Sequence, residues 1–141
     1  MLAHPNFDKP FKLYTDASDV GLGAILAQDD ENNKEHVIAY EARTLNAAEK
    51  NYPTTEKECL AVVWGIEKFK HFLGGYTPFK VYTDHAALRT MMKQDEPPPR
   101  RARWLEKLTN YQFEVEHRPG TKMQHADYLS RIENVETLTK P

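Results

Sequence analysis

The sequence lacks the features that mark secreted, disulfide-bonded or membrane-spanning proteins. Its 141 residues contain one cysteine, Cys59, so no disulfide can form within the chain. Because Cys59 falls in an apolar helical stretch, we expect a buried thiol and a reducing compartment. No apolar run approaches the roughly 18 residues of a membrane span. Met1 is not followed by a basic and then apolar signal segment.

An excess of positive charge is also missing. The chain has 19 Lys and Arg against 21 Asp and Glu, a net charge of -2. A protein that holds nucleic acid by bulk charge alone should be basic, so any such contact must be local or assisted by metal ions. With 40% hydrophobic and 28% charged residues, the composition indicates one globular domain, large enough for a sheet with helices against it.

Patterns of period two and period 3.6 alternate along the chain and predict a mixed α/β domain. Three strands joined by short polar links form an antiparallel meander, and the later elements follow in the order helix, strand, helix, helix, strand, helix. The expected strands are Phe11 to Ser18, Gly21 to Gln28, His36 to Ala42, Phe79 to Thr83 and Phe113 to His117. The expected helices are Thr54 to Leu73, Ala86 to Met92, Arg103 to Tyr111 and Ala126 to Ile132. We also expect a helical turn in Leu45 to Tyr52, a firm break at Pro97 to Pro99 and a turn at Pro119 and Gly120.

These elements imply a five-stranded sheet flanked by helices, in which a three-strand antiparallel meander is joined by parallel strands, because parallel strands need crossover connections. We expect residues 1–132 to form the domain and residues 133–141 to form a tail or linker.

The peptide Lys-x-Tyr-Thr-Asp occurs twice, at Lys12 to Asp16 and at Lys80 to Asp84, each time closing a predicted strand. If the two strands lie side by side and parallel, Asp16 and Asp84 point the same way, about 5 Å apart. Two bare carboxylates at that distance repel each other, and a divalent cation between them removes the repulsion. Both aspartates could instead be turn formers.

A third acid lies on the longest predicted helix. Val62, Ile66, Phe69 and Leu73 mark the face that packs on the sheet, and a step back of four residues from Val62 reaches Glu58. Glu58 therefore continues the buried stripe, whereas Glu56 leads to a polar face. The pattern Thr55-x-x-Glu58 also fits a capping box, in which Glu58 would only satisfy a backbone N–H.

A fourth acid, Asp127, opens the last predicted helix, where an Asp is usually a cap or a partner of the helix dipole. The set of four changes this interpretation. Two aspartates at strand ends, one inward glutamate and one aspartate before a helix could converge on one edge of one sheet.

Longer stretches carry a resemblance to a known family. The segments YTDASDVGLGAILAQ, AYEARTLNAAEKNYPTTEKECLAVVWGIEKFKHFL, VYTDHAAL and RARWLEKLTNYQFEVEHRPGTKMQHADYLSR resemble the ribonuclease H domain of the Pol polyprotein of Ty3/gypsy-type LTR retrotransposons. The resemblance covers roughly Leu2 to Ile132, with the motifs in the family's order. The opening LAHPNFDKPF resembles the passage from reverse transcriptase into ribonuclease H, so we interpret Met1 as an introduced start.

The resemblance implies an endonuclease that cuts the RNA strand of RNA/DNA hybrids during reverse transcription. The family's four catalytic carboxylates fall on Asp16, Glu58, Asp84 and Asp127, and none is replaced. They imply two Mg²⁺ ions, for which Mn²⁺ can substitute, because both prefer oxygen ligands. By analogy Asp16 bridges the ions, Asp127 serves the ion on the water side, and Glu58 with Asp84 serves the ion on the leaving-group side.

Further residues are implied less directly. His117 matches a histidine that assists product release in retroviral relatives, although a lone His at a strand end is more often structural. Thr54 and Thr55 lie where relatives contact the hybrid, yet they are also good helix caps. The dense basic cluster of Arg100, Arg101, Arg103 and Lys107 could contact phosphates or form a solvated helix face.

The expected partners are the RNA/DNA hybrid and the reverse transcriptase domain of the same polyprotein, with no membrane involved. The extra basic helix of bacterial ribonucleases H is missing, since only Lys93 to Pro99 lies between the two helices that flank its place in the chain. The polymerase should therefore supply much of the affinity for the hybrid. We expect a monomeric domain inside the cell, within virus-like particles of the retrotransposon. Two alternatives are a catalytically silent tether or domesticated interaction domain, and an integrase-like core, which places its glutamate later in the chain.

Overall fold

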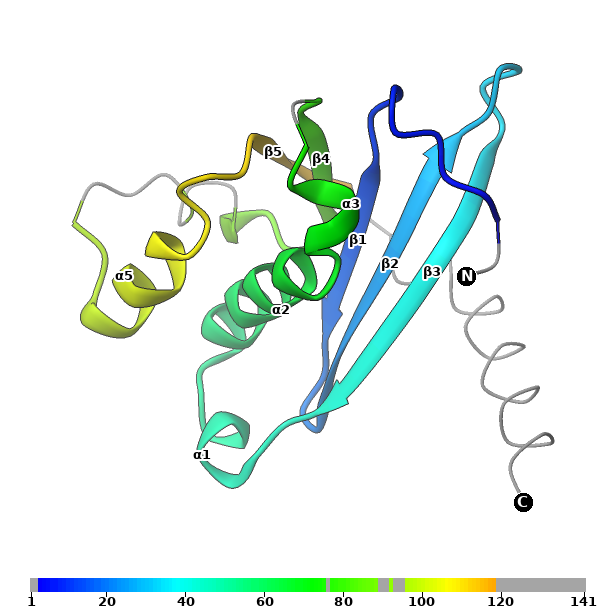
Figure 1. Ribbon diagram of the computed structural model, residues 1–141. Coiled ribbons are helices and arrows are strands. Elements are labelled where there is room, and N and C mark those ends of the chain that lie inside the picture. Colours follow the sequence, from blue (N-terminus) through cyan, green and yellow to red (C-terminus); the bar gives the residue numbers. More distant parts are fainter. Residues whose placement is uncertain (1–2, 76, 89–91, 93–95, 119–141) are drawn as a thin grey trace, which may run out of the picture.

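A five-stranded sheet forms the centre of the computed structural model, which describes residues 3–75, 77–88, 92 and 96–118 (Figure 1). The strand order is β3-β2-β1-β4-β5, with β1 antiparallel to β2, β2 antiparallel to β3, and β4 parallel to both β1 and β5. The strands are β1 (Lys12–Ala17), β2 (Gly21–Asp29), β3 (Glu35–Thr44), β4 (Phe79–Thr83) and β5 (Phe113–His117). The predicted meander with parallel strands is confirmed, and so are the bounds of β4 and β5.

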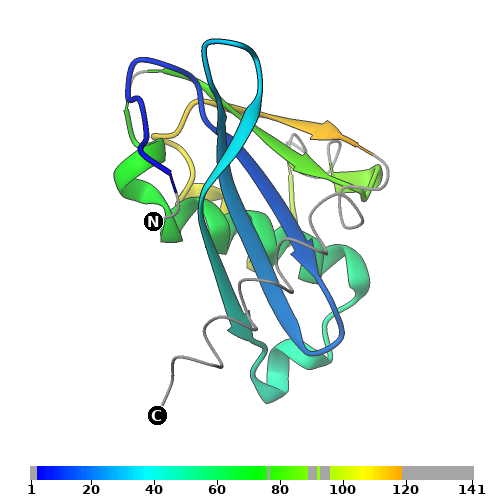
Figure 2. The ribbon, with the colours of Figure 1, turned by 90° about the vertical axis from the view of Figure 1, so that its right-hand side faces the viewer.

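Within the described part of the chain, three helices follow the meander and a fourth precedes β5. They are α1 (Ala47–Lys50), α2 (Thr54–Lys68), α3 (Lys70–Leu73) and α5 (Pro99–Glu106). Figure 1 shows α2 and α5 on one side of the sheet, and Figure 2 shows the strands in front of α2. The described residues contain no helix that is both long and apolar enough to cross a membrane.

The single predicted helix Thr54 to Leu73 is wrong at its end, because the helix breaks at Phe69. This residue has φ -102° and ψ 27°, and it separates α2 from α3. No Gly or Pro marks the break in the sequence. The ring of Phe72 lies edge-on to Phe69 and to Phe11, at 6.4 and 5.9 Å between centroids. We attribute the break to this aromatic packing, which overrides the helical pattern of the local sequence.

The predicted helix Arg103 to Tyr111 is also misplaced. The helix α5 begins at Pro99, with Pro98 as its N-cap, and it ends at Glu106, after which the chain continues in turns. Proline is compatible with the first helical position, because the N–H that it lacks would have no partner within the helix. The proline run therefore begins the helix rather than excluding it.

The core lies between α2 and the sheet and follows the predicted stripe. Val62 and Ile66 are fully buried, and Cys59 beside them is buried as expected. Burial raises the pKa of the Cys59 thiol to about 12. Gly65 allows the close approach of helix and sheet, because a Cβ there would lie 3.2 Å from Ala24 Cβ.

Several predicted elements lie wholly or partly outside the described residues. These are the helix Ala86 to Met92, the turn at Pro119 and Gly120, the helix Ala126 to Ile132 and the tail from Glu133 to Pro141.

The helical turn expected within Leu45 to Tyr52 is confirmed as α1, whose N-cap Asn46 forms a capping box with Glu49. Glu49 also holds Arg43 of β3 through two hydrogen bonds of 2.7 and 2.8 Å.

Candidate metal centre

The two Lys-x-Tyr-Thr-Asp peptides lie side by side, as the sequence predicted. Strands β1 and β4 pair in parallel, with Lys12 opposite Lys80 and Tyr14 opposite Tyr82. The rings of the two tyrosines stack, with 5.0 Å between their centroids. The register therefore places both aspartates two residues beyond the tyrosine pair, at the carboxyl edge of the sheet.

Three of the four predicted acids meet at this edge. Asp16, Glu58 and Asp84 each offer a carboxylate oxygen, and these oxygens lie within 4.8 Å of one another. Glu58 is buried, and the two aspartates are half-buried. Three carboxylates at this distance repel one another strongly unless cations or protons neutralise them. An all-oxygen donor set of this kind fits Mg²⁺ or Mn²⁺.

Neighbouring hydroxyl groups make the turns that follow the two aspartates. Asp16 lies within β1, and the Ser18 hydroxyl oxygen accepts from the N–H groups of Val20 and Gly21. After β4, the hydroxyl oxygen of Thr83 accepts from the His85 N–H at 3.1 Å. Because these hydroxyls serve the turns, the alternative that the aspartates are there as turn formers is not favoured.

Glu58 reaches the cluster from the first turns of α2, where it is 4% exposed. The N-cap of α2 is Pro53, and no side chain caps the helix start. The alternative of a capping box between Thr55 and Glu58 is therefore wrong. A hollow of about 330 Å³ beside this helix start is lined by Thr54, Lys57 and Glu58 together with the β1–β2 turn.

The other predicted residues divide into described and undescribed ones. Asp127 lies outside the described residues, so its place in the cluster stays a prediction. The ring of His117, at the end of β5, lies with Nε2 3.1 Å from the backbone oxygen of Asp84. His117 is exposed, and this contact places it beside Asp84, one of the three clustered acids. The exposed Thr54 and half-buried Thr55 lie at the start of α2.

The basic cluster of α5 is not uniform. The side chain of Arg101 is only 11% exposed, and its Nη2 donates to Glu56 Oε1 of α2 at 3.2 Å. Arg100 is exposed and stacks over the ring of Tyr52, 3.9 Å from its centroid. Arg103 is also exposed. Arg101 therefore joins two helices, whereas Arg100 and Arg103 face solvent.

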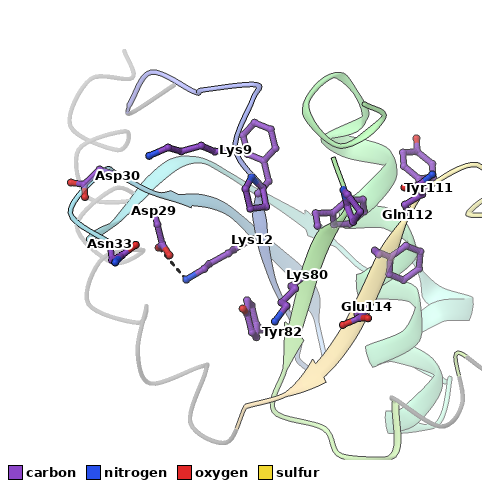
Figure 3. Close-up of a pocket in the computed structure, with 15 residues that line it drawn as sticks. Lys9, Lys12, Asp29, Asp30, Asn33, Lys80, Tyr82, Tyr111, Gln112 and Glu114 are labelled. Atoms are coloured by element: carbon purple, nitrogen blue, oxygen red, sulfur yellow. Dashed lines mark hydrogen bonds and ion pairs between the residues drawn. The ribbon is translucent and has the colours of Figure 1, made fainter. Parts of the chain in front are cut away.

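A separate groove of about 1010 Å³ lies at the opposite, amino end of β1 and β4 (Figure 3). Lys12 and Lys80 line it, and each is paired with an acid, Lys12 with Asp29 and Lys80 with Glu116, both at 3.0 Å. None of the clustered acids lines this groove. The cluster of acids is thus separate from this groove.

One residue near the cluster was missed by sequence reasoning. Arg118 follows β5 directly, and its guanidinium lies 4.0 Å from the centroid of the Tyr82 ring. Its position next to His117 in the chain is visible in the sequence, but its contacts with β1 and β4 depend on the order of strands in the sheet.

A mixed sheet in the order β3-β2-β1-β4-β5, with acids at the carboxyl edge of β1 and β4, defines a ribonuclease H-like domain. The family model that describes an RNase H-like domain found in reverse transcriptase matches residues 6–111. The chain belongs to this family, and its enzyme class is ribonuclease H.

Relatives of known sequence are Pol polyproteins. The chain is 42% identical over 132 residues to the Retrovirus-related Pol polyprotein from transposon opus of Drosophila melanogaster, covering 94% of this chain and 13% of that polyprotein. It is 38% identical over 135 residues to the Transposon Tf2-3 polyprotein of Schizosaccharomyces pombe, covering 94% of this chain and 10% of that polyprotein. The chain thus spans about an eighth or less of these relatives.

Solved structures show the same fold. A foamy viral protease-reverse transcriptase in complex with dsDNA matches with a TM-score of 0.66 at 17% identity, over 83% of this chain and 25% of that one. The RNase H1 from the archaeon Halobacterium salinarum matches with a TM-score of 0.60 at 17% identity, over 85% and 93%. LC11-RNase H1 in complex with RNA/DNA hybrid matches with a TM-score of 0.62 at 16% identity, over 84% of this chain and 92% of that one.

Proposed function

We propose that this domain is an endonuclease that hydrolyses the RNA strand of RNA/DNA hybrids during reverse transcription. The observation that carries the proposal is the convergence of Asp16, Glu58 and Asp84 within 4.8 Å at the carboxyl edge of the sheet. Membership of the family supports it, because that family occurs in reverse transcriptases. The reverse transcriptase of the same polyprotein, inside a virus-like particle, would be its working partner.

The three acids are suited to hold divalent cations, and we propose that Asp127 completes the set. Two bound cations, Mg²⁺ or Mn²⁺, would activate the attacking water and stabilise the leaving oxygen. Asp16 would contact both cations, Asp127 would serve the water side, and Glu58 and Asp84 would serve the leaving-group side. Burial of Glu58 restricts the movement of its side chain.

Selection of RNA requires contacts outside the acids. The hollow lined by Thr54 and Lys57 beside Glu58 offers hydroxyl and ammonium groups at the edge of the cluster. A 2′-hydroxyl can both donate and accept hydrogen bonds, so polar groups there could distinguish RNA from DNA. Arg100 and Arg103 are the exposed cations of α5 that could contact phosphates.

His117 would act after the chemical step. Its contact with the backbone oxygen of Asp84 ties it to one acid of the cluster. We propose that it assists product release, so that its loss slows turnover more than single-turnover cutting.

The test is Asp16→Asn in the present chain. We expect Mn²⁺- or Mg²⁺-dependent cutting of a labelled hybrid to fall below detection, because a neutral amide cannot replace a carboxylate between two cations. Circular dichroism and thermal unfolding should show a folded domain. Duplex RNA and duplex DNA serve as substrate controls.

Unchanged cutting by Asp16→Asn would remove the proposed mechanism. Absence of cutting by the unaltered chain, at protein concentrations that saturate binding of the hybrid, would instead favour a catalytically silent tether. The clustering of three acids argues against that alternative, because a tether has no use for mutually repelling carboxylates.

A further inference from the structure

One side chain beyond the metal centre contacts both tyrosines of the repeated peptide. The Arg118 guanidinium lies 4.0 Å from the centroid of the Tyr82 ring, and its Nη1 donates to the Tyr14 hydroxyl oxygen at 3.0 Å. The backbone N–H of Arg118 also donates to the Thr83 carbonyl oxygen at 2.8 Å. Arg118 therefore contacts β4 twice, through a backbone hydrogen bond and by stacking of its guanidinium on Tyr82. The same guanidinium contacts β1 through the hydroxyl of Tyr14.

The contact continues across the sheet to its other edge. The Tyr14 hydroxyl donates to Glu35 Oε2 of β3 at 2.8 Å. A carboxylate oxygen can only accept, so the Tyr14 hydroxyl is the donor in this bond. Since a guanidinium can only donate, the direction of both bonds is fixed: Arg118 donates to Tyr14, and Tyr14 donates to Glu35.

This chain of contacts lies immediately before the acids of the metal centre. The pairing of β1 with β4 covers Lys12 to Tyr14 opposite Lys80 to Tyr82, and the tyrosines are the last paired residues. Asp16 lies two residues further along β1, and Asp84 lies two residues beyond Tyr82, directly after the end of β4. The strands fan apart towards these ends (Figure 2). The separation of the two aspartates therefore depends on how firmly the tyrosine pair is held.

We propose that Arg118 is a positioning residue for the metal centre: by clamping Tyr14 and Tyr82 it sets the spacing between Asp16 and Asp84. The two carboxylates repel each other without cations, so an interaction between β1 and β4 must resist their separation. A planar guanidinium suits this role, because it stacks on one ring and donates in its own plane to the other tyrosine. This inference rests on the proposed function of the cluster as a cation site.

The test measures Mn²⁺ affinity directly, from the signal of free Mn²⁺ in electron paramagnetic resonance. We expect Arg118→Ala to weaken Mn²⁺ binding at least about 10-fold, as is typical when a group that orients metal ligands is lost. Arg118→Lys keeps the charge but cannot stack and donate in the same plane, so its affinity should lie closer to that of Arg118→Ala than to that of the unaltered chain.

The matched control is Lys80→Ala. Lys80 pairs with Glu116 at 3.0 Å and so also joins β4 to β5, but at the end of β4 away from the acids. It should bind Mn²⁺ like the unaltered chain. Tyr82→Leu removes the stacking ring and leaves Arg118 in place, so it should reproduce the loss seen in Arg118→Ala. Thermal unfolding of each variant identifies any that does not fold.

Two results would overturn the inference. The first is normal Mn²⁺ affinity in Arg118→Ala, and the second is normal affinity in Arg118→Lys, which would mean that charge alone matters. Crystal structures of the unaltered chain and Arg118→Ala separate this inference from the proposed function. If the unaltered chain binds no Mn²⁺, the proposed cation site is wrong. The role of Arg118 is then still tested by the two crystal structures, because it requires the carboxylates of Asp16 and Asp84 to lie farther apart in Arg118→Ala.

Discussion

At the scale of single residues, neighbouring arginines in α5 have different environments. Arg101 is mostly buried and paired with Glu56, which is 45 residues earlier in the chain, whereas Arg103 is exposed. The guanidinium of Arg101 therefore binds a carboxylate in place of water. Its removal would take this partner from Glu56 at the interface between α5 and α2. Arg103 is available for phosphate contact in a way that Arg101 is not.

This difference predicts that two alanine substitutions change different properties, one the affinity for the hybrid and the other the stability of the fold. Arg103→Ala should weaken binding of an RNA/DNA hybrid and leave the free energy of unfolding within about 0.5 kcal/mol of the unaltered chain. Arg101→Ala should lower the free energy of unfolding by about 1–3 kcal/mol, because it leaves a partly buried acid without this donor. Urea unfolding and fluorescence anisotropy with a labelled hybrid measure the two effects. Equal loss of affinity without loss of stability in both variants would show that Arg101 also contacts the hybrid.

Residue identities in the candidate site were largely predictable, whereas their partners were not. Asp16 and Asp84 stand in identical peptides, and Glu58 stands on a regular apolar stripe, so local patterns mark all three. The pairing of Arg101 with Glu56 depends on how α5 packs on α2, and no local pattern records that. Local sequence patterns thus mark the acids of the candidate site more readily than the interactions that hold those acids in place.

At the scale of elements, the repeated peptide works because β1 and β4 pair in register. The parallel pairing was predictable from the repeat, since two equal peptides in adjacent parallel strands bring equal side chains together. The break between α2 and α3 at Phe69 was not, because it arises from aromatic contacts with Phe72. Likewise Pro99 reads as a helix breaker locally but begins α5 in the structure.

The contact of α2 with the sheet gives a prediction at this scale. In Gly65→Val the new Cβ would lie 3.2 Å from Ala24 Cβ and 3.3 Å from Thr15 Cγ2, and the two further methyl groups would need more room. Since these neighbours belong to β1 and β2, the helix must move. We expect the free energy of unfolding to fall by about 2–3 kcal/mol, measured by urea denaturation.

The same substitution at Gly75 is the control. A Cβ at Gly75 would meet nothing within 4 Å, and this residue is exposed. Gly75→Val should therefore change stability by less than about 0.5 kcal/mol. If the two valine variants lose the same stability, close packing of α2 on the sheet is not what requires glycine at position 65.

At the scale of the whole molecule, charge is distributed unfavourably for a protein that meets nucleic acid. The net charge is -2, and three acids gather where a scissile phosphate would lie. The lysines Lys12 and Lys80 are paired with acids at the amino end of the sheet, away from the cluster. The ammonium of Lys57 lies beside Glu58 but pairs with Asp19 at 3.8 Å, so the three clustered carboxylates should repel a phosphate until cations change the sign of the local charge.

This charge distribution predicts that cations govern binding as well as cutting. Affinity for a labelled RNA/DNA hybrid should be at least about 10-fold tighter in Ca²⁺ than in EDTA at matched ionic strength, a difference of about 1.4 kcal/mol. Ca²⁺ prefers the same oxygen ligands as Mg²⁺ and allows binding to be measured by anisotropy. Asp84→Asn should remove most of the difference, since it takes one charged ligand from the cluster. Tight binding in EDTA that falls steeply with added KCl would contradict this account, because basic side chains would then carry the affinity without cations.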